Sequence, residues 1–250
     1  MCGRYASVKD PGRLAAEFDA FDATGGEAGG ADYNVAPTKD VLTVVQRHPR
    51  DEEGYRDPSR TERSVRVMRW GLVPKWADDP SIGTRMINAK SETVTTKPAF
   101  RNAIRYYRCL LPVDGWYEWR RDSGTKQPYF MTSTDGSSLA LAGLWATWRG
   151  SATGGAPLVS CSVLTAEAVG QLADVHERMP LVLPRSAWSR WLDPDLEDVT
   201  GLLRPPGRDL VDELELRPVS SEVNNVRNNR PELLERIDVG SGATERLFES

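Results

Sequence analysis

Apolar and polar residues alternate along several short stretches of this chain, with the period of two that is typical of half-buried β-strands. Turn-forming runs such as Asp122-Ser123-Gly124 and Asp135-Gly136 separate some of these stretches and indicate antiparallel hairpins. The pattern predicts strands over residues 2–7, 41–46, 64–70, 109–119, 128–132, 139–148 and 157–164.

Helical spacing is confined to short segments. Asp10 is a typical helix cap and Pro11 a typical first helical residue, so we expect a helix to begin there. Because strands outnumber helices and do not alternate regularly with them, the sequence predicts an α+β fold. Further helices are predicted over residues 97–107, 166–172, 185–192 and 231–236.

The predicted architecture is a single domain with a largely antiparallel β-sheet or barrel-like core and peripheral helices. We assign residues 1–235 to this domain and residues 236–250 to a C-terminal tail. The polar, charged run over residues 47–63 is typical of a surface insertion, in which we expect His48 to be solvated.

The composition limits the cellular compartment and the metal and cofactor chemistry that we expect of the chain. The chain has 250 residues, a net charge of −4, three cysteines and two histidines. Three widely spaced cysteines argue against a disulfide framework and favour a reducing compartment. Without clustered cysteine and histidine ligands we expect no metal and no cofactor. Because the N-terminus lacks a secretion signal and no apolar run is long enough to span a bilayer, we expect a cytoplasmic protein with no membrane partner. We also expect it to be a monomer.

Basic and aromatic residues gather in the middle of the chain. Residues 85–126 carry nine basic and four acidic side chains, within a chain whose net charge is negative. Several of the eight tryptophans lie in turn-rich segments, as in residues 70–76 and 115–119. Aromatic rings interleaved with cations are typical of grooves that stack the bases of single-stranded nucleic acid. A solvated basic face and tryptophans packed in the core are the alternative interpretation.

The most distinctive candidate for chemistry is Cys2, which directly follows Met1. A small second residue permits removal of the initiator methionine, which leaves a free α-amine and a thiol on neighbouring carbons. Such a 1,2-aminothiol captures an aldehyde twice, first as a Schiff base and then as a thiazolidine ring. The reference pKa of an α-amine is about 7.7–8.0 and that of a thiol about 8.5, so modest tuning makes both reactive near neutrality. The alternative is that Cys2 has no chemical role.

Two further side chains suit proton transfer. Glu118 lies between Tyr117 and Trp119 in a predicted strand, and a carboxyl among aromatic rings loses hydration, which raises its pKa. His176 lies in a loop between a predicted helix and a strand, and histidine exchanges protons near neutral pH. A surface glutamate and a structural histidine are the respective alternatives.

Other polar residues are candidates for positioning and for phosphate contacts. Asn88 precedes what the sequence presents as a helix N-terminus capped by Ser91, where its amide is able to orient reacting groups. Lys90 and Arg178 suit phosphate binding. Asn34, in the run Tyr-Asn-Val-Ala-Pro, suits holding the N-terminal segment.

Taken together, nine short segments resemble the SOS response-associated peptidase (SRAP) family, the abasic-site processing proteins. Single motifs of this length are common, whereas nine in order are specific, and the resemblance extends to Asn-Val-Arg-Asn at 225–228. The nine are Met-Cys-Gly-Arg (1–4), Tyr-Asn-Val-Ala-Pro (33–37), Trp-Gly-Leu-Val-Pro (70–74), Ile-Asn-Ala-Lys-Ser-Glu-Thr (87–93), Lys-Pro-Ala-Phe-Arg (97–101), Asp-Gly-Trp-Tyr-Glu-Trp (114–119), Lys-Gln-Pro-Tyr-Phe (126–130), Ala-Gly-Leu-Trp (142–145) and His-Glu-Arg-Met-Pro (176–180).

The resemblance implies that Cys2 is a covalent nucleophile toward the ring-opened aldehyde of an abasic site in single-stranded DNA. It implies that Glu118 moves protons during Schiff-base formation, that His176 helps to open the sugar, and that Asn88 positions the reacting groups. The expected product is a thiazolidine crosslink that shields the lesion, with the protein nucleoid-associated while it is bound. The residues expected to contact DNA are Arg4, Asn34, Trp76, Lys90, Trp119 and Arg178.

Two features of the resemblance leave room for other activities. The family commonly has arginine where this chain has Lys90, so a point charge replaces a bidentate fork. The peptidase label suggests self-processing that removes Met1, and β-elimination from the Schiff base would give weak lyase activity. Two alternatives stay open at this point: an N-terminal-nucleophile peptidase or amidohydrolase acting on other substrates, and a non-catalytic single-strand binding module.

Overall fold

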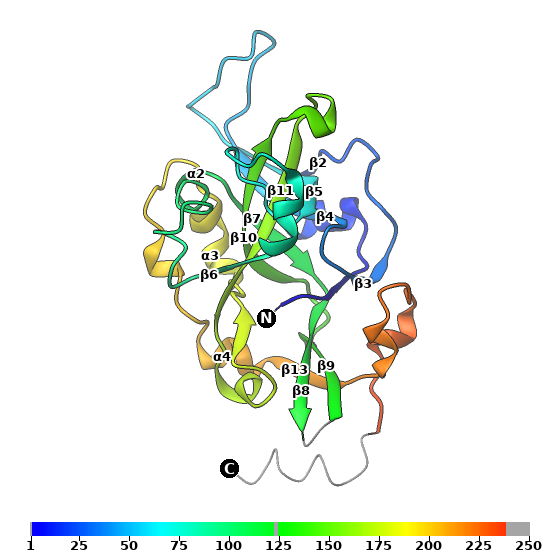
Figure 1. Ribbon diagram of the computed structural model, residues 1–250. Helices are drawn as coiled ribbons and strands as arrows, with labels where there is room; N and C mark the ends of the chain where they lie inside the picture. The colour runs from blue at the N-terminus through cyan, green and yellow to red at the C-terminus, as the bar shows by residue number, and fades with distance from the viewer. Residues whose placement is uncertain (1, 123–124, 239–250) are drawn as a thin grey trace.

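The computed structural model describes residues 2–122 and 125–238, and in these ranges the chain forms two β-sheets with short helices around them (Figure 1). The α+β prediction of a single domain with a sheet core and peripheral helices is confirmed. Most of the predicted tail, residues 239–250, lies outside the described residues, and the domain bounds stay a prediction.

The larger sheet forms the barrel-like core. Its strand order is β12-β11-β10-β7-β4-β5-β2, with β6 paired to β11, and a parallel pairing of β11 with β5 closes five of these strands into a ring. Apolar side chains fill the interior, where Trp70 and Met68 are buried. The strands are β2 (Phe21–Asp22), β4 (Asp40–Arg47), β5 (Glu62–Trp70), β6 (Asn88–Lys90), β7 (Arg108–Val113), β10 (Leu139–Trp148), β11 (Leu158–Glu167) and β12 (Arg178–Pro180).

The smaller sheet carries the N-terminal strand between two others. Its order is β13-β9-β8-β1-β3, so β1 has β8 on one side and β3 on the other, both antiparallel. The strands are β1 (Tyr5–Ser7), β3 (Asp32–Val35), β8 (Gly115–Asp122), β9 (Thr125–Ser133) and β13 (Leu214–Pro218).

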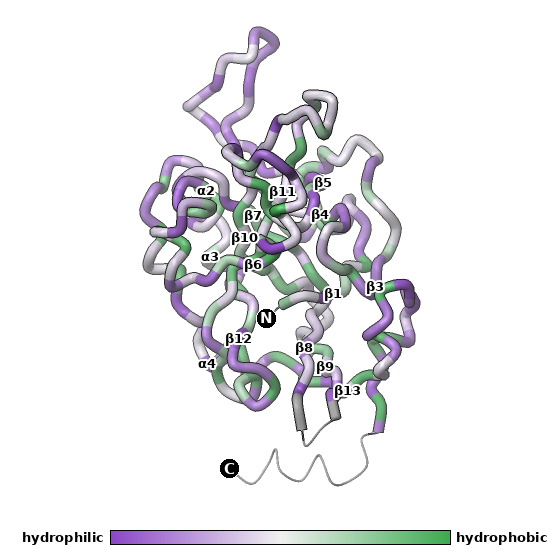
Figure 2. The backbone as a smooth tube through the Cα atoms, in the orientation of Figure 1, coloured by the Kyte–Doolittle hydropathy of each residue, from purple (hydrophilic) through white to green (hydrophobic). Residues whose placement is uncertain are grey.

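Helices in the described ranges are short and lie outside the sheets (Figures 1 and 2). The helix at Pro11 forms as predicted, and the Asp10 carboxylate accepts a hydrogen bond of 2.9 Å from the backbone N–H of Arg13. The α-helices are α1 (Pro11–Glu17), α2 (Ala103–Tyr106), α3 (Arg185–Leu192) and α4 (Arg208–Asp212). The 3-10 helices are η1 (Pro80–Arg85), η2 (Ser151–Thr153), η3 (Gly170–Asp174), η4 (Thr200–Leu202), η5 (Ser221–Asn224) and η6 (Pro231–Leu234).

Two strand predictions require correction. The predicted strand 109–119 is two strands, β7 and β8, because Asp114 interrupts it where the chain passes from one sheet to the other. The Asp114 carboxylate accepts a hydrogen bond of 2.6 Å from the backbone N–H of Val8, which fixes this crossing point. Asp135-Gly136 does not close a hairpin, since the strands on either side of it, β9 and β10, belong to different sheets.

The hairpin predicted at Asp122-Ser123-Gly124 is partly described. Strands β8 and β9 pair antiparallel as far as Asp122 and Thr125, as the prediction requires. Residues 123–124 of the turn itself lie outside the described residues.

Several predicted helices are shorter or absent. The segment 97–107 is helical only at α2, and 231–236 is the single 3-10 turn η6. The segment 166–172 begins as strand, because β11 continues to Glu167 to pair with β12. The helix expected to begin at Ser91 is absent, and turns follow β6 at this point.

The prediction that His48 is solvated is wrong. Its side chain is buried, and both ring nitrogens lie within hydrogen-bond distance of oxygen atoms of the protein. Nδ1 lies 3.1 Å and 2.8 Å from the carbonyl oxygens of Asp57 and Arg60, and Nε2 lies 3.1 Å from the Asp195 carboxylate. The histidine thereby ties the polar insertion to a segment near α3, which no local pattern reveals.

Candidate functional site

The N-terminal segment lies against β6 and β8, because Asn88 contacts Cys2 and β1 pairs with β8 (Figure 1). Strand β1 pairs with β8 so that Tyr5 lies opposite Trp116, and the backbone N–H of Tyr117 donates to the Arg4 carbonyl at 2.9 Å. Continuing this register toward the N-terminus sets Gly3 opposite Glu118, and the Glu118 carboxyl is close enough to Cys2 to influence its thiol. The Cys2 side chain is fully buried and belongs to the main core cluster.

Asn88 holds the backbone of this segment. Its register in β6 sets it beside Val163 of β11, and its side-chain Nδ2 donates a hydrogen bond of 2.7 Å to the Cys2 carbonyl. The Asn88 Oδ1 atom is buried and accepts no hydrogen bond within the described residues. The amide therefore fixes the Cys2 backbone with one end and presents an acceptor with the other.

Glu118 is buried, with 4% of the residue exposed. Desolvation raises the pKa of Glu118 from 4.5 to about 7, which confirms the shift that its aromatic neighbours predicted. Burial also raises the pKa of the Cys2 thiol well above its ordinary value, and the nearby charge of Glu118 raises it further. Near neutral pH the site thus combines a protonated thiol with a carboxyl that exchanges its proton readily.

His176 lies between η3 and β12, on the other side of β11 from Asn88. Strand β11 pairs with β6 at Val163 and with β12 at Glu167, so one strand positions both side chains. Val175, next to His176, packs in the same core cluster as Cys2. The backbone N–H of Arg178 donates to His176 Nδ1 at 2.9 Å.

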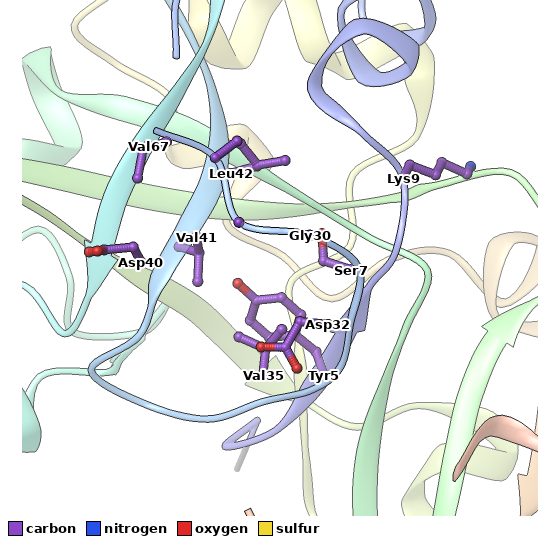
Figure 3. A pocket seen from close by; sticks show the side chains of 12 residues that line it. Tyr5, Ser7, Lys9, Gly30, Asp32, Val35, Asp40, Val41, Leu42 and Val67 are labelled. Atoms are coloured by element: carbon purple, nitrogen blue, oxygen red, sulfur yellow. The ribbon is translucent and has the colours of Figure 1, made fainter. Parts of the chain in front are cut away.

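A small cavity flanks the site behind β1, beneath the glycine-rich loop at residues 28–30. Figure 3 shows the hydroxyl end of Tyr5 pointing into it beside Val35, Val41 and Asp32. Its volume is about 90 Å³, well below the ~300–1,000 Å³ typical of ligand sites. The Tyr5 ring also packs against the Trp70 ring, with 5.0 Å between the two ring centroids. This cavity is therefore a gap beside the core.

Arg4 and Asn34, expected at the DNA, are committed to other partners. The Arg4 guanidinium donates to Asn34 Oδ1 at 2.7 Å and to the Val223 carbonyl at 2.8 Å. Asn34 is fully buried, and its Nδ2 lies 3.3, 3.1 and 2.9 Å from the carbonyl oxygens of Val223, Asn225 and Asn228. With no exposed surface Asn34 does not reach DNA, and it clamps the C-terminal segment instead.

Arg178 is also engaged within the protein. Its guanidinium donates to both carboxylate oxygens of Glu92, at 2.7 Å and 3.1 Å, and to the Thr165 carbonyl at 2.7 Å. Only 10% of its side chain is exposed, so the fork expected to grip phosphate is already occupied. Lys90, by contrast, is exposed at the end of β6.

The two tryptophans expected at the DNA lie at the surface in different settings. Trp76 is 57% exposed. Trp119 is partly exposed, its Nε1 donates to Asn224 Oδ1 at 2.7 Å, and the Lys126 ammonium lies 5.5 Å from its ring centroid. Trp76 thus has ring surface open to solvent, and Trp119 has a cation over its ring.

Sequence reasoning missed a cavity of about 440 Å³ beside Trp76. Lys75 and Arg101 line it together with the rings of Tyr107 and Trp145, and none of its lining residues is acidic. Neither cation forms an ion pair within the described ranges, and the Lys75 ammonium lies 5.7 Å from the Tyr107 ring centroid. The aromatic residues and cations are far apart in sequence, which is why no local motif revealed the cavity.

Sequence reasoning also passed over Glu92, although it lies within the Ile-Asn-Ala-Lys-Ser-Glu-Thr segment.

No group of three or more histidine, cysteine, aspartate or glutamate side chains able to hold a metal ion occurs in the described part of the chain. Among the described helices, none combines the length and apolar character needed to cross a membrane.

Comparisons with known proteins show the family of the chain. The family model "SOS response associated peptidase (SRAP)" matches residues 1–226, and the chain belongs to this family. "Abasic site processing protein YoqW" of Bacillus subtilis (strain 168) is 34% identical over 94% of this chain and 99% of its own length. "Abasic site processing protein HMCES" of Mus musculus is 32% identical over 87% of this chain and 70% of its own length.

A solved structure has the same fold. The crystal structure of a protein from Bacteroides thetaiotaomicron superimposes with a TM-score of 0.77, covering 94% of this chain and 100% of that one. Its sequence identity is 22%, so the likeness concerns the fold alone.

Proposed function

We propose that this chain processes abasic sites in single-stranded DNA by forming a thiazolidine crosslink through Cys2 after removal of Met1. The proposal is supported by the names of its relatives, which are abasic-site processing proteins. The observation that carries it is the placement of Cys2, whose carbonyl is held by Asn88 while its thiol lies within the field of a carboxyl of pKa about 7.

The first step is opening of the sugar ring. An abasic deoxyribose is a cyclic hemiacetal, and it opens when the C1′–O4′ bond breaks, O4′ gains a proton and the C1′ hydroxyl loses one. We assign donation to O4′ to His176 and acceptance of the hydroxyl proton to Glu118. A carboxyl whose pKa is about 7 is present in both forms near neutrality, as a group that accepts and later returns a proton requires.

The second step joins the α-amine of Cys2 to C1′. The amine nitrogen adds to the aldehyde carbon, and the resulting carbinolamine loses water when Glu118 returns its proton to the leaving hydroxyl. The product is a Schiff base. With its reference pKa of about 7.7–8.0, an α-amine is partly neutral at physiological pH and competent for this addition.

The third step is addition of the thiol. The Cys2 sulfur bonds to C1′ across the C=N bond, its proton passes to the nitrogen, and a five-membered thiazolidine ring closes. Because burial keeps the Cys2 thiol protonated, sulfur attack needs a base, and Glu118 is close enough to influence the thiol. Over the three steps one water is released and no redox partner is required.

The proposed DNA path follows the exposed aromatic and basic residues. Trp76 with the cavity lined by Lys75 and Arg101 offers ring faces and cations without an opposing carboxylate. Lys90 is exposed beside Asn88, and Trp119 has Lys126 over its ring. Stacking on aromatic residues tolerates any base, which suits a protein that recognises a site where the base is missing.

The test is intact-mass analysis after mixing the protein with a single-stranded oligonucleotide that contains one abasic site. Wild-type protein is expected to give a denaturation-resistant adduct, and Cys2→Ala and Cys2→Ser none or little. Since Cys2→Ala retains the α-amine, it should still form a Schiff base that borohydride traps. An undiminished adduct with Cys2→Ala would overturn the proposal. Binding to intact and abasic strands alike, with no covalent product, would support a binding module instead.

A further inference from the structure

The loop that carries His176 is tied to Glu92 through a side chain that was expected to bind DNA. Arg178 donates from two guanidinium nitrogens to the two oxygens of Glu92, and from one of them also to the carbonyl and hydroxyl oxygens of Thr165. This hydrogen bonding lowers the pKa of Glu92, so the carboxylate remains charged. A bidentate pair of this kind fixes orientation as well as distance.

The same residue also controls the histidine ring. The backbone N–H of Arg178 is 2.9 Å from His176 Nδ1 and is only able to donate, so Nδ1 must act as the acceptor. A neutral imidazole that accepts at Nδ1 carries its single proton at Nε2. Protonation at Nδ1 would place the N–H of the His176 ring opposite the backbone N–H of Arg178 and break this hydrogen bond.

We propose that Glu92 is a positioning residue, which acts through Arg178 to hold His176 as the Nε2–H tautomer and so presents a proton donor to the sugar. The role of the donor rests on the proposed function, whereas the tautomer is a property of the free protein. Arg178 is thereby a link between Glu92 and the histidine loop.

The pairing of the strands explains how Glu92, which follows β6, affects the start of β12. Glu92 follows β6, Arg178 begins β12, and both strands pair with the same end of β11, to which Thr165 belongs. Arg178 therefore joins the two outer strands across the middle one. Loss of the Glu92 carboxylate removes one half of this connection and frees the turn at residues 176–178.

The experiment is ¹⁵N NMR of the two histidine side chains in free wild-type protein, Glu92→Ala and the control Glu167→Ala. His176→Gln identifies the His176 signals. Glu167 is the matched control because it lies opposite Arg178 in the β11–β12 pairing, is exposed, and forms no ion pair within the described residues. Arg178→Lys, which keeps the charge but not the fork, is a second test if Glu92→Ala fails to fold.

We expect wild type and Glu167→Ala to have the His176 proton on Nε2, and Glu92→Ala and Arg178→Lys to populate both tautomers. The rate of adduct formation should fall by about 10-fold to 100-fold in the latter two, as loss of alignment typically costs. A wild-type proton on Nδ1, or an unchanged tautomer in a folded Glu92→Ala protein, would overturn the inference. If wild type forms no adduct while the tautomers behave as expected, the crosslinking function fails and the positioning role stands.

Discussion

The side-chain amide of Asn88 donates a 2.7 Å hydrogen bond to the backbone carbonyl of Cys2, joining a strand of the barrel to the first residues of the chain. The N-terminus of a protein usually frays, and a nucleophile placed there needs an anchor. Asn88 supplies that anchor from β6, whose pairing with β11 makes it rigid. The reactivity of Cys2 should therefore depend on this amide.

Substitution of Asn88 by Asp tests the anchor. A carboxylate at this position has no N–H to donate and opposes the Cys2 carbonyl, so the amine should lose its alignment. We expect the rate of adduct formation to fall by about 100-fold, the scale of a misplacement near 1 Å. The measurement is a single-turnover time course on a denaturing gel. An unchanged rate in a folded variant would show that the hydrogen bond does not position Cys2.

Glu118→Gln tests the buried carboxyl through stability. The pKa of Glu118 is raised from 4.5 to about 7 in the folded protein, so the folded state binds more protons than the unfolded state between these values. Wild-type stability should therefore fall as pH rises from 4.5 to 7, by about 3 kcal/mol from this group. The variant should lack this component in urea unfolding followed across pH. Parallel pH profiles for both proteins would contradict the shift.

The same substitution tests the role of Glu118 in catalysis. Glutamine keeps the shape of the side chain but neither accepts nor returns a proton. We expect adduct formation to slow by about 10²–10⁴-fold, the usual contribution of a general acid–base group. A rate within twofold of wild type at pH 7 would remove Glu118 from the proton path.

Asn34→Ala tests the reassignment of Asn34 from DNA contact to structure. The change leaves buried carbonyl groups of the C-terminal segment without their donor, which should lower the free energy of unfolding by about 1–3 kcal/mol. Affinity of the folded variant for single-stranded DNA should stay within about twofold of wild type. A large loss of affinity with unchanged stability would restore Asn34 to the DNA interface.

The cavity beside Trp76 predicts a change in salt dependence. In the double variant Lys75→Ala/Arg101→Ala, two cations without ion-pair partners in the described ranges are lost. If each contacts one phosphate, the slope of log affinity against log salt should decrease in size by about 1.4. Arg105→Ala is the control, since this neighbouring arginine is paired with Glu197 outside the cavity. Equal slopes in all three proteins would exclude this cavity from the DNA path.

Local patterns predicted the elements whose partners lie nearby or whose periodicity is strong. The strand at residues 139–148 and the helix at 185–192 form with the predicted bounds, because an unbroken apolar run and a helical repeat specify them. The prediction of a helix over 166–172 failed because Thr165, Ala166 and Glu167 gain pairing partners in β12, and tertiary pairing overrides local preference.

The features of the site also fall into those that local sequence predicts and those that depend on distant residues. The chemistry of Cys2 follows from its position, and the raised pKa of Glu118 follows from the aromatic residues beside it in sequence. The pairing of Arg178 with Glu92, of Asn34 with the carbonyl groups of the C-terminal segment and of His48 with Asp195 did not follow, because these partners lie 86, at least 189 and 147 residues away. When the distant protein partner of a polar residue is unknown, sequence assigns that residue to a ligand, as with Arg178 and Asn34, or to solvent, as with His48.

The most direct test of the central claim is to map the covalent bond by tandem mass spectrometry of the digested adduct. The account predicts a single modified peptide that begins at Cys2, with Met1 absent, the mass of one water lost and no borohydride-reducible imine. An adduct located on a lysine, or on protein that retains Met1, would contradict it.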